Sequence, residues 1–200
     1  GISSHVYAYL NWRPLNSVVV DDYTFYQDTT TSYYGSSFLF QLYLYEHYGG
    51  KNYTGSLVRS SANGRNGVSN GLAGANTNDR FDEAFEKFMV ALSVNDRGAE
   101  DGTTYSYSMQ SYPNGNIRHP LLDSHSGGDI PISKERIGQN QIYDYSLNSF
   151  RFSSPPEVGA IYRLKLDYTA GNPIVALYFE TSPTRTVKHI DLGGARAKNI

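Results

Sequence analysis

Residues 33–50 read YYGSSFLFQLYLYEHYGG and form the most strongly patterned stretch of the chain. Phe38, Leu42 and Tyr45 recur at the spacing of one side of an α-helix, and a Gly-Gly pair supplies a stop at the end. The adjoining stripe carries Leu39, Tyr43 and Glu46. Because aromatic residues occur nearly all round this helix, we expect it to be buried on most sides, with the other segments packed around it.

Further helices are expected on both sides of this segment. Residues 53–62 form a second helical stretch that an Asn/Gly-rich turn at residues 63–67 ends. Residues 79–95 form a third helix, which opens with acidic side chains and carries an apolar stripe of Phe81, Phe85, Phe88, Met89 and Leu92. A short helix at residues 6–10 and a helical turn at residues 68–73 complete a small helical subdomain with three main helices.

The pattern changes in the second half of the chain. Residues 97–141 are rich in Gly, Ser, Asn and Asp and are expected to be mostly irregular. Apolar and polar residues then alternate at residues 161–168 and 186–192, with a continuous apolar run at residues 175–179. This alternation predicts an antiparallel sheet that forms half of a small β-sandwich.

The predicted fold class is therefore α+β, because helices come first and strands second. The expected organisation is a helical lobe over residues 1–100, an irregular Tyr/Gly/Ser-rich connection over residues 101–140, and an antiparallel β domain over residues 141–200.

Composition excludes several classes of function. The net charge is −2 with both signs mixed along the chain, so no basic stripe indicates nucleic-acid binding. No apolar run is long enough to span a membrane. Residues 1–4 lack the features of a signal peptide, and the missing initiator Met indicates a processed or trimmed start.

The chain has no cysteine, which excludes disulfides and Cys-ligated zinc. Eighteen Tyr residues with abundant Asn, Ser and Gly are typical of an exported bacterial protein. We therefore expect an extracytoplasmic location, whether secreted, periplasmic or at the cell surface.

The histidines give little indication of a metal site. Glu46-His47 is the nearest approach to an HExxH motif, but position 50 is Gly, so His47 reads as a helix-end histidine. His119, Asp123 and His125 lie close together in HPLLDSH, yet a zinc site needs further ligands. No metal or other cofactor is expected in this chain.

Two sets of tyrosines are candidate functional residues. Tyr33 and Tyr34 open the central helix, where a phenol can donate a hydrogen bond to a developing oxyanion or form a buried staple onto the first turn. The second set lies in a Tyr-rich loop that can either stack on a glycan or peptide or cover an edge of the core. It comprises Tyr105, Tyr107 and Tyr112.

The segments TSYYGSSFLFQLYLYEHYGG and DRFDEAFEKFMVALSVND, over roughly residues 20–96, resemble the region after the active site of hyicolysin-like neutral zinc metallopeptidases of the gluzincin group. The counterparts are Tyr34-Gly35, Phe38 to Leu44, Glu46, Tyr48-Gly49, Phe81, Phe85, Ala91-Leu92 and Asn95-Asp96. This chain departs from the family in lacking the HExxH helix and the downstream Glu ligand, which the resemblance places before residue 1. The tail from residue 159 to 192 is similar only in character.

The resemblance implies the C-terminal portion of an exported metalloendopeptidase, with zinc held by the missing N-terminal catalytic lobe and a peptide or protein as substrate. By this resemblance, Tyr34, or its neighbour Tyr33, would line the cleft and donate a hydrogen bond to the transition state. The alternative is a stand-alone extracytoplasmic module that binds a glycan or peptide without catalysis, through a groove formed by residues 103–118. A degenerate peptidase that acts as a scaffold also fits the sequence.

Overall fold

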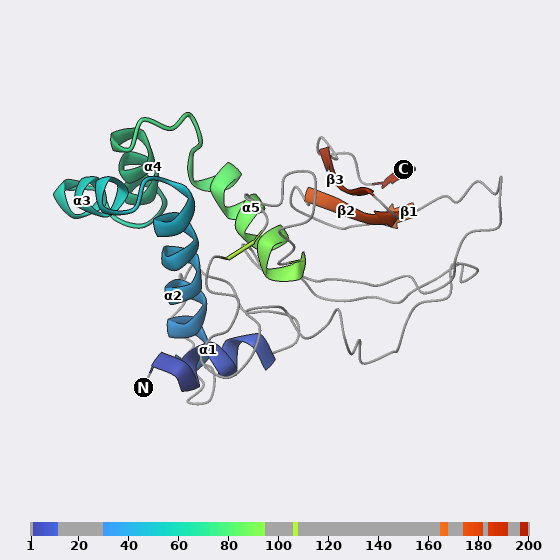
Figure 1. Ribbon diagram of the computed structural model, residues 1–200, viewed down its shortest axis with the longest axis horizontal. Coiled ribbons are helices and arrows are strands. Elements are labelled where there is room, and N and C mark those ends of the chain that lie inside the picture. The colour runs from blue at the N-terminus through green and yellow to red at the C-terminus, as the bar shows by residue number, and fades with distance from the viewer. Residues whose placement is uncertain are drawn as a thin grey trace.

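The computed structural model describes residues 2–11, 30–94, 106–107, 165–167, 174–181, 184–191 and 197–199. Figure 1 shows helices in the N-terminal half and strands near the C-terminus. The helices are α1 (Ile2–Asn11), α2 (Thr30–His47), α3 (Lys51–Arg59), α4 (Gly64–Gly74) and α5 (Phe81–Val94). The strands are β1 (Lys165–Asp167), β2 (Ile174–Thr181), β3 (Thr184–Asp191) and β4 (Ala197–Asn199). None of the helices in these ranges is long and apolar enough to cross a membrane.

Helix α2 is the long helix expected at the centre of the chain, and α1, α3 and α5 all contact it. Its most deeply buried side is the stripe that carries Leu39 and Tyr43. Leu39 and Tyr43 are fully buried, whereas Phe38 and Leu42 are only partly buried and Tyr45 is 45% exposed. Apolar side chains occur on nearly every side of α2, so helical spacing alone did not distinguish the two stripes.

The α2–α5 interface is built from aromatic rings. Phe40 of α2 lies against three phenylalanines of α5, with ring centroids 5.5 Å from Phe81, 5.8 Å from Phe85 and 5.0 Å from Phe88. Two of these pairs meet edge to face, which is a favoured geometry for aromatic rings. The apolar stripe expected on α5 is therefore the side that it buries.

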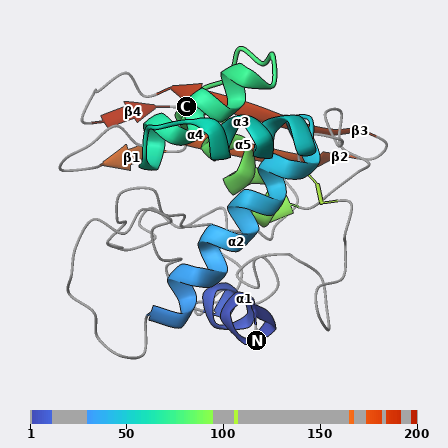
Figure 2. The same ribbon diagram turned by 90° about the vertical axis from the view of Figure 1, so that its left-hand side faces the viewer.

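Helices α3 and α4 lie against each other (Figures 1 and 2), and glycines form part of their interface. A Cβ atom on Gly67 would lie 2.6 Å from the carbonyl oxygen of Ala62, and one on Gly71 would lie 3.0 Å from the Tyr53 ring. The predicted turn at residues 63–67 is wrong, because α4 begins at Gly64. Glycine has a low helix propensity, but here it permits close packing of one helix on another.

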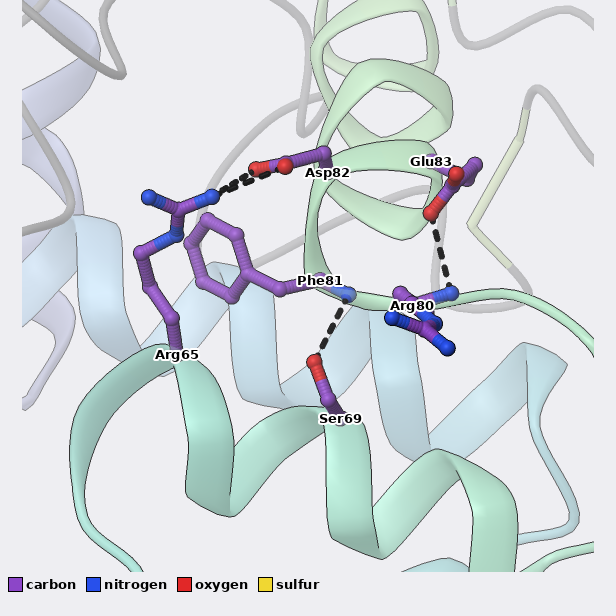
Figure 3. Close-up of polar contacts among 6 residues, drawn as sticks. All are labelled: Arg65, Ser69, Arg80, Phe81, Asp82 and Glu83. Carbon is purple, nitrogen blue, oxygen red and sulfur yellow. Dashed lines mark hydrogen bonds and ion pairs between the residues drawn. The ribbon is translucent and has the colours of Figure 1, made fainter.

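Polar contacts join α4 to the beginning of α5 (Figure 3). The Ser69 hydroxyl accepts a hydrogen bond of 3.2 Å from the backbone N–H of Phe81. The Glu83 carboxylate accepts one of 3.0 Å from the N–H of Arg80. The first N–H groups of a helix lack partners within that helix. Glu83, which belongs to α5, and Ser69, which belongs to α4, therefore cap the N-terminal end of α5.

Arg65 of α4 makes two further contacts at the same junction (Figure 3). Its guanidinium lies 2.7 Å from the Asp82 carboxylate and 5.4 Å from the centroid of the Phe81 ring. The ion pair is about half exposed, so it contributes little to stability, while the cation–π contact covers the edge of the aromatic interface.

The predicted antiparallel β-sandwich is wrong. Among the described residues the strands form two separate two-stranded antiparallel ladders, β2 with β3 and β1 with β4. In the longer ladder Ile174 lies opposite Asp191 and Thr181 opposite Thr184. A sandwich requires two sheets of several strands packed face to face. Alternation identifies single strands but does not determine how many pair or how sheets stack.

The core of the described residues is helical. Their buried apolar side chains lie on the five helices, at Tyr48 just after α2, and at Tyr107. Within the described ranges, the expected α+β class with three main helices and a β-sandwich-like half is therefore corrected to a helical unit of five helices and two short β ladders. The domain boundaries expected at residues 100 and 140 lie outside the described residues.

Candidate functional site

The position of Tyr34 is set by a close crossing of α1 and α2. A Cβ atom on Gly35 would clash with the backbone carbonyl of His5, so only glycine allows the two helices to approach this closely. Ser36, the next residue, is fully buried in the same crossing. The crossing therefore fixes the first turns of α2 against α1 and places Tyr34 beside His5.

The side chains of Tyr34 and His5 form a pair at the surface. Their ring centroids are 5.6 Å apart, with an angle of 30° between the ring planes. Tyr34 is 61% exposed and His5 is partly buried. A buried staple is therefore not the conformation of Tyr34. A phenol O–H and an imidazole N–H can both donate hydrogen bonds.

The structure says less about the other predicted site residues. Tyr33 belongs to α2, but its side chain is outside the described part of the structure. Tyr105 and Tyr112 also lie outside it. Tyr107 is fully buried, and its ring centroid is 6.0 Å from that of Tyr43. Tyr107 thus covers an edge of the core and is not brought together with Tyr34.

A cluster of buried phenols surrounds Tyr107. Its hydroxyl donates a hydrogen bond of 3.4 Å to the backbone carbonyl of Leu39. Burial raises the pKa of Tyr107 and of Tyr9 well above the usual value for a phenol, so both stay protonated. The Tyr9 hydroxyl is the one fully buried side-chain polar atom among the described residues that lacks a hydrogen-bond partner. These phenols are structural and are unsuited to act as bases.

A hydrogen bond of His47 connects the end of α2 to the segment that contains Tyr107. Its Nε2 lies 2.7 Å from the backbone carbonyl oxygen of Ser106, and because a carbonyl only accepts, Nε2 carries the proton. The imidazole also packs on the Tyr43 ring at 4.4 Å. Burial lowers the pKa of His47, although the Ser106 hydrogen bond and the Glu46 charge act in the opposite direction. The neutral imidazole therefore has a structural role, since it holds the Ser106 segment against the end of α2.

A second polar cluster lies where α2, α5 and the segment before α5 meet. The Asp79 carboxylate accepts hydrogen bonds of 2.6 Å from both the Tyr48 hydroxyl and the Lys87 ammonium, at the same oxygen. Burial alone would raise the pKa of Asp79, but the hydrogen bonds from Lys87 and Tyr48 outweigh it and lower that pKa. Burial and the bond to Asp79 raise the pKa of Tyr48.

The Tyr48–Asp79–Lys87 cluster contains residue types that occur in acid–base sites, but the pKa shifts of Tyr48 and Asp79 fit a structural role. A phenol with a raised pKa and a carboxylate with a lowered pKa both retain their resting protonation state. Sequence reasoning did not find this cluster, because Tyr48 and Asp79 are 31 positions apart and no motif connects them.

The described residues contain no group of three or more His, Cys, Asp or Glu side chains that is arranged to hold a metal ion. His119, Asp123 and His125 lie outside them, as does the side chain of His189 on β3. The absence of a metal from this chain therefore stays a prediction.

Comparison of the chain with protein-family models, with curated proteins and with solved structures finds no match. The functional proposal therefore depends on the residues themselves and on the sequence resemblance. Among the tyrosines expected from the sequence to form a site, Tyr34 is the one whose side chain is both described and exposed.

Proposed function

We propose that this chain is the non-catalytic C-terminal part of an exported zinc metalloendopeptidase. The motivation is the sequence resemblance over roughly residues 20–96. The described residues do not fit a zinc site, since they bring no three ligating side chains together. The metal and the general base would belong to a separate catalytic lobe, and this chain would contribute to the substrate cleft.

The exposed phenol of Tyr34 is the observation that supports this proposal best. It lies in the first turns of α2, which packs against α1 at Gly35 and against α5 through Phe40. A donor on a rigid element stabilises developing negative charge without a cost of reorganisation during the reaction. We infer that Tyr34 donates a hydrogen bond to the oxyanion of the tetrahedral intermediate of peptide hydrolysis.

The resemblance also leads us to expect an apolar face on the helical unit where a catalytic lobe would dock. The large apolar side chains that the described residues expose are Tyr7, Tyr34, Tyr45 and Val58. They are spread over three helices, and single exposed apolar side chains are common on soluble proteins. The proposal therefore rests on Tyr34 and on the resemblance, not on a docking face.

The alternative of a stand-alone binding module required Tyr105, Tyr107 and Tyr112 to form an exposed aromatic groove. Tyr107 is fully buried, so one of the three rings is not available to stack on a ligand. No other observation favours that alternative.

The first test is the intact mass and N-terminal sequence of the protein as its native host produces it. We expect a longer chain that carries HExxH upstream of these residues, or a partner fragment that carries it. A native chain that begins near Gly1 and has no such partner would contradict the proposal.

The second test addresses Tyr34 in the longer chain. A Tyr34→Phe variant should lose on the order of a hundredfold in kcat for a peptide substrate, the usual effect of removing one oxyanion donor. Its KM should change little, because the hydrogen bond strengthens only in the transition state. Tyr45→Phe is the matched control, since Tyr45 is another exposed tyrosine of α2. Equal activities of the two variants would overturn the role of Tyr34.

A further inference from the structure

Three Asn-Gly pairs occur within nine residues of the chain, at positions 63–64, 66–67 and 70–71. An Asn side chain followed by Gly is chemically labile, because a glycine leaves the following backbone nitrogen unhindered. The reaction needs a backbone conformation in which that nitrogen reaches the side-chain carbonyl carbon. In the folded protein the three pairs differ in backbone conformation and in their contacts.

The first pair lies at the beginning of α4, outside regular helical geometry. Asn63 has an extended backbone (φ −108°, ψ 166°), is exposed, and makes no capping hydrogen bond with its side chain. Gly64 has a positive φ of 58°, and no atom lies within 4 Å of the place where its Cβ would be. As the first residue of α4, Gly64 has an N–H without a partner inside the helix. Both reacting groups are therefore accessible.

The second and third pairs lie inside α4 and are held there. The N–H of Gly67 donates to the carbonyl of Asn63 at 3.3 Å, and Gly67 and Gly71 are both buried against α3 or the segment after it. The Asn70 side-chain amide donates a hydrogen bond of 3.1 Å to the Ser60 hydroxyl. Reaction at either pair requires local opening of α4 and loss of these contacts.

We propose that Asn63 is a site of spontaneous deamidation and that the fold protects Asn66 and Asn70 from the same reaction. The Gly64 nitrogen gives up its proton to a solvent base and forms a bond to Cγ of Asn63. The bond from Cγ to Nδ2 breaks, and the nitrogen leaves as ammonia after taking up a proton. Water then opens the succinimide ring at either carbonyl and gives aspartate or isoaspartate.

The two products have different consequences for α4. Aspartate keeps the backbone and places a negative charge at the N-terminal end of the helix, where it is favourable. Isoaspartate carries the main chain through Cβ and adds one carbon to it. This displaces the Asn63 carbonyl that accepts the hydrogen bond from Gly67, so the first turn of α4 loosens.

Trypsin separates the reactive pair from the protected ones. Cleavage after Arg59, Arg65 and Arg80 puts Asn63 alone in the peptide of residues 60–65. The peptide of residues 66–80 contains Asn66 and Asn70 together with Asn76 and Asn78, which are not followed by Gly, and fragment ions assign any conversion to one of them. The native protein is incubated in mildly alkaline buffer, with a parallel sample in denaturant. Mass spectrometry then measures the replacement of the amide by a carboxylate in each peptide over time.

We expect conversion in the native protein to be about tenfold or more faster at Asn63 than at Asn66 and Asn70, because only the latter two require helix opening. In denaturant the three pairs should react at similar rates, which is the matched control for intrinsic reactivity. Equal rates in the native protein would overturn the proposal, as would faster conversion in the peptide of residues 66–80 or no conversion of native Asn63 while the denatured chain reacts.

An Asn63→Ser variant provides an independent check. Serine keeps a capping side chain at the start of α4 but has no amide to lose. We expect the peptide of residues 66–80 to stay unconverted in the native variant. Conversion there at the rate seen for Asn63 in the unmodified protein would show that α4 gives no protection.

Discussion

The α2–α5 and α3–α4 interfaces bring helices together by opposite means. Phe40 of α2 packs against Phe81, Phe85 and Phe88 of α5, so large rings fill the space between the two helices. In the α3–α4 pair, Gly67 and Gly71 remove side chains, and the backbone of α4 itself packs closely. One interface buries large apolar side chains, and the other depends on the absence of side chains.

This difference determines how each interface responds to substitution. Removing a ring from the α2–α5 interface loses apolar burial and leaves a cavity. Adding a methyl group to the α3–α4 interface forces backbone or side-chain atoms apart. The polar contacts of Ser69 and Arg65 connect the two regions, because they fasten α4 to the start of α5.

The largest effect is expected for Phe88→Ala in the aromatic interface. Phe88 is fully buried, and its loss should lower the free energy of unfolding by about 3–5 kcal/mol. Urea unfolding of both proteins measures the difference. Val58→Ala is the control, because Val58 is 78% exposed and its truncation should change stability little. Equal losses for the two variants would contradict the assignment of the core.

Gly67→Ala should have the next largest effect, in the glycine interface. The added Cβ would lie 2.6 Å from the carbonyl oxygen of Ala62, and such overpacking costs about 1–3 kcal/mol. Alanine gains roughly 1 kcal/mol of helix propensity, which offsets part of this loss.

Gly55→Ala on α3 is the matched control for Gly67→Ala. There the nearest atom to the added Cβ is the flexible end of Arg59, at 3.4 Å, so the propensity gain should stabilise the protein. If both variants changed the free energy of unfolding in the same direction, the claim that the α3–α4 interface depends on the absence of side chains would be contradicted.

Asp79→Asn tests the polar cluster at the edge of the aromatic interface. Its loss should lower the free energy of unfolding near neutral pH by about 1 kcal/mol, because Asp79 and Lys87 are partly exposed and solvent weakens their ion pair. The pKa of Asp79 is lowered in the folded state. Its contribution is therefore present above the unfolded pKa of about 3.9 and is lost as the pH falls through the lower folded value.

The pH dependence separates charge from shape at Asp79. Urea unfolding of the natural protein and of Asp79→Asn should differ most near neutral pH, and the two should converge in acid. A difference in unfolding free energy that stays constant down to acid pH would show that the carboxylate charge is unimportant.

Ser69→Ala should have the smallest effect, at the junction between the two regions. It removes the acceptor for the Phe81 N–H and should cost about 0.5–1 kcal/mol, as for the loss of a helix cap. Ser61→Ala is the control, since Ser61 is an exposed residue between α3 and α4. Hydrogen exchange of the first amides of α5 should quicken in Ser69→Ala alone, and unchanged protection there would contradict the capping role.

The candidate site was found from the sequence only in part. The sequence indicates Tyr34 because the helical pattern starts at residue 33, whereas α2 begins at Thr30. The pairing of Tyr34 with His5 depends on the Gly35 crossing between two distant segments. The same limit applies to the Tyr48–Asp79–Lys87 cluster, whose members no local pattern connects. For the Tyr-rich loop the sequence left two alternatives open, and the structure decides between them only at Tyr107, whose ring is buried against α2.

The sequence by itself determined that the segments of α2 and α5 become helices, since helical spacing is a local property of the chain. Tertiary structure decided which stripe of α2 faces inward, that the glycine-rich residues 64–67 join α4, and that the described strands form two separate ladders. Each of these depends on which distant surface supplies the complementary shape. That information lies in contacts between segments and not in the order of residues within any one of them.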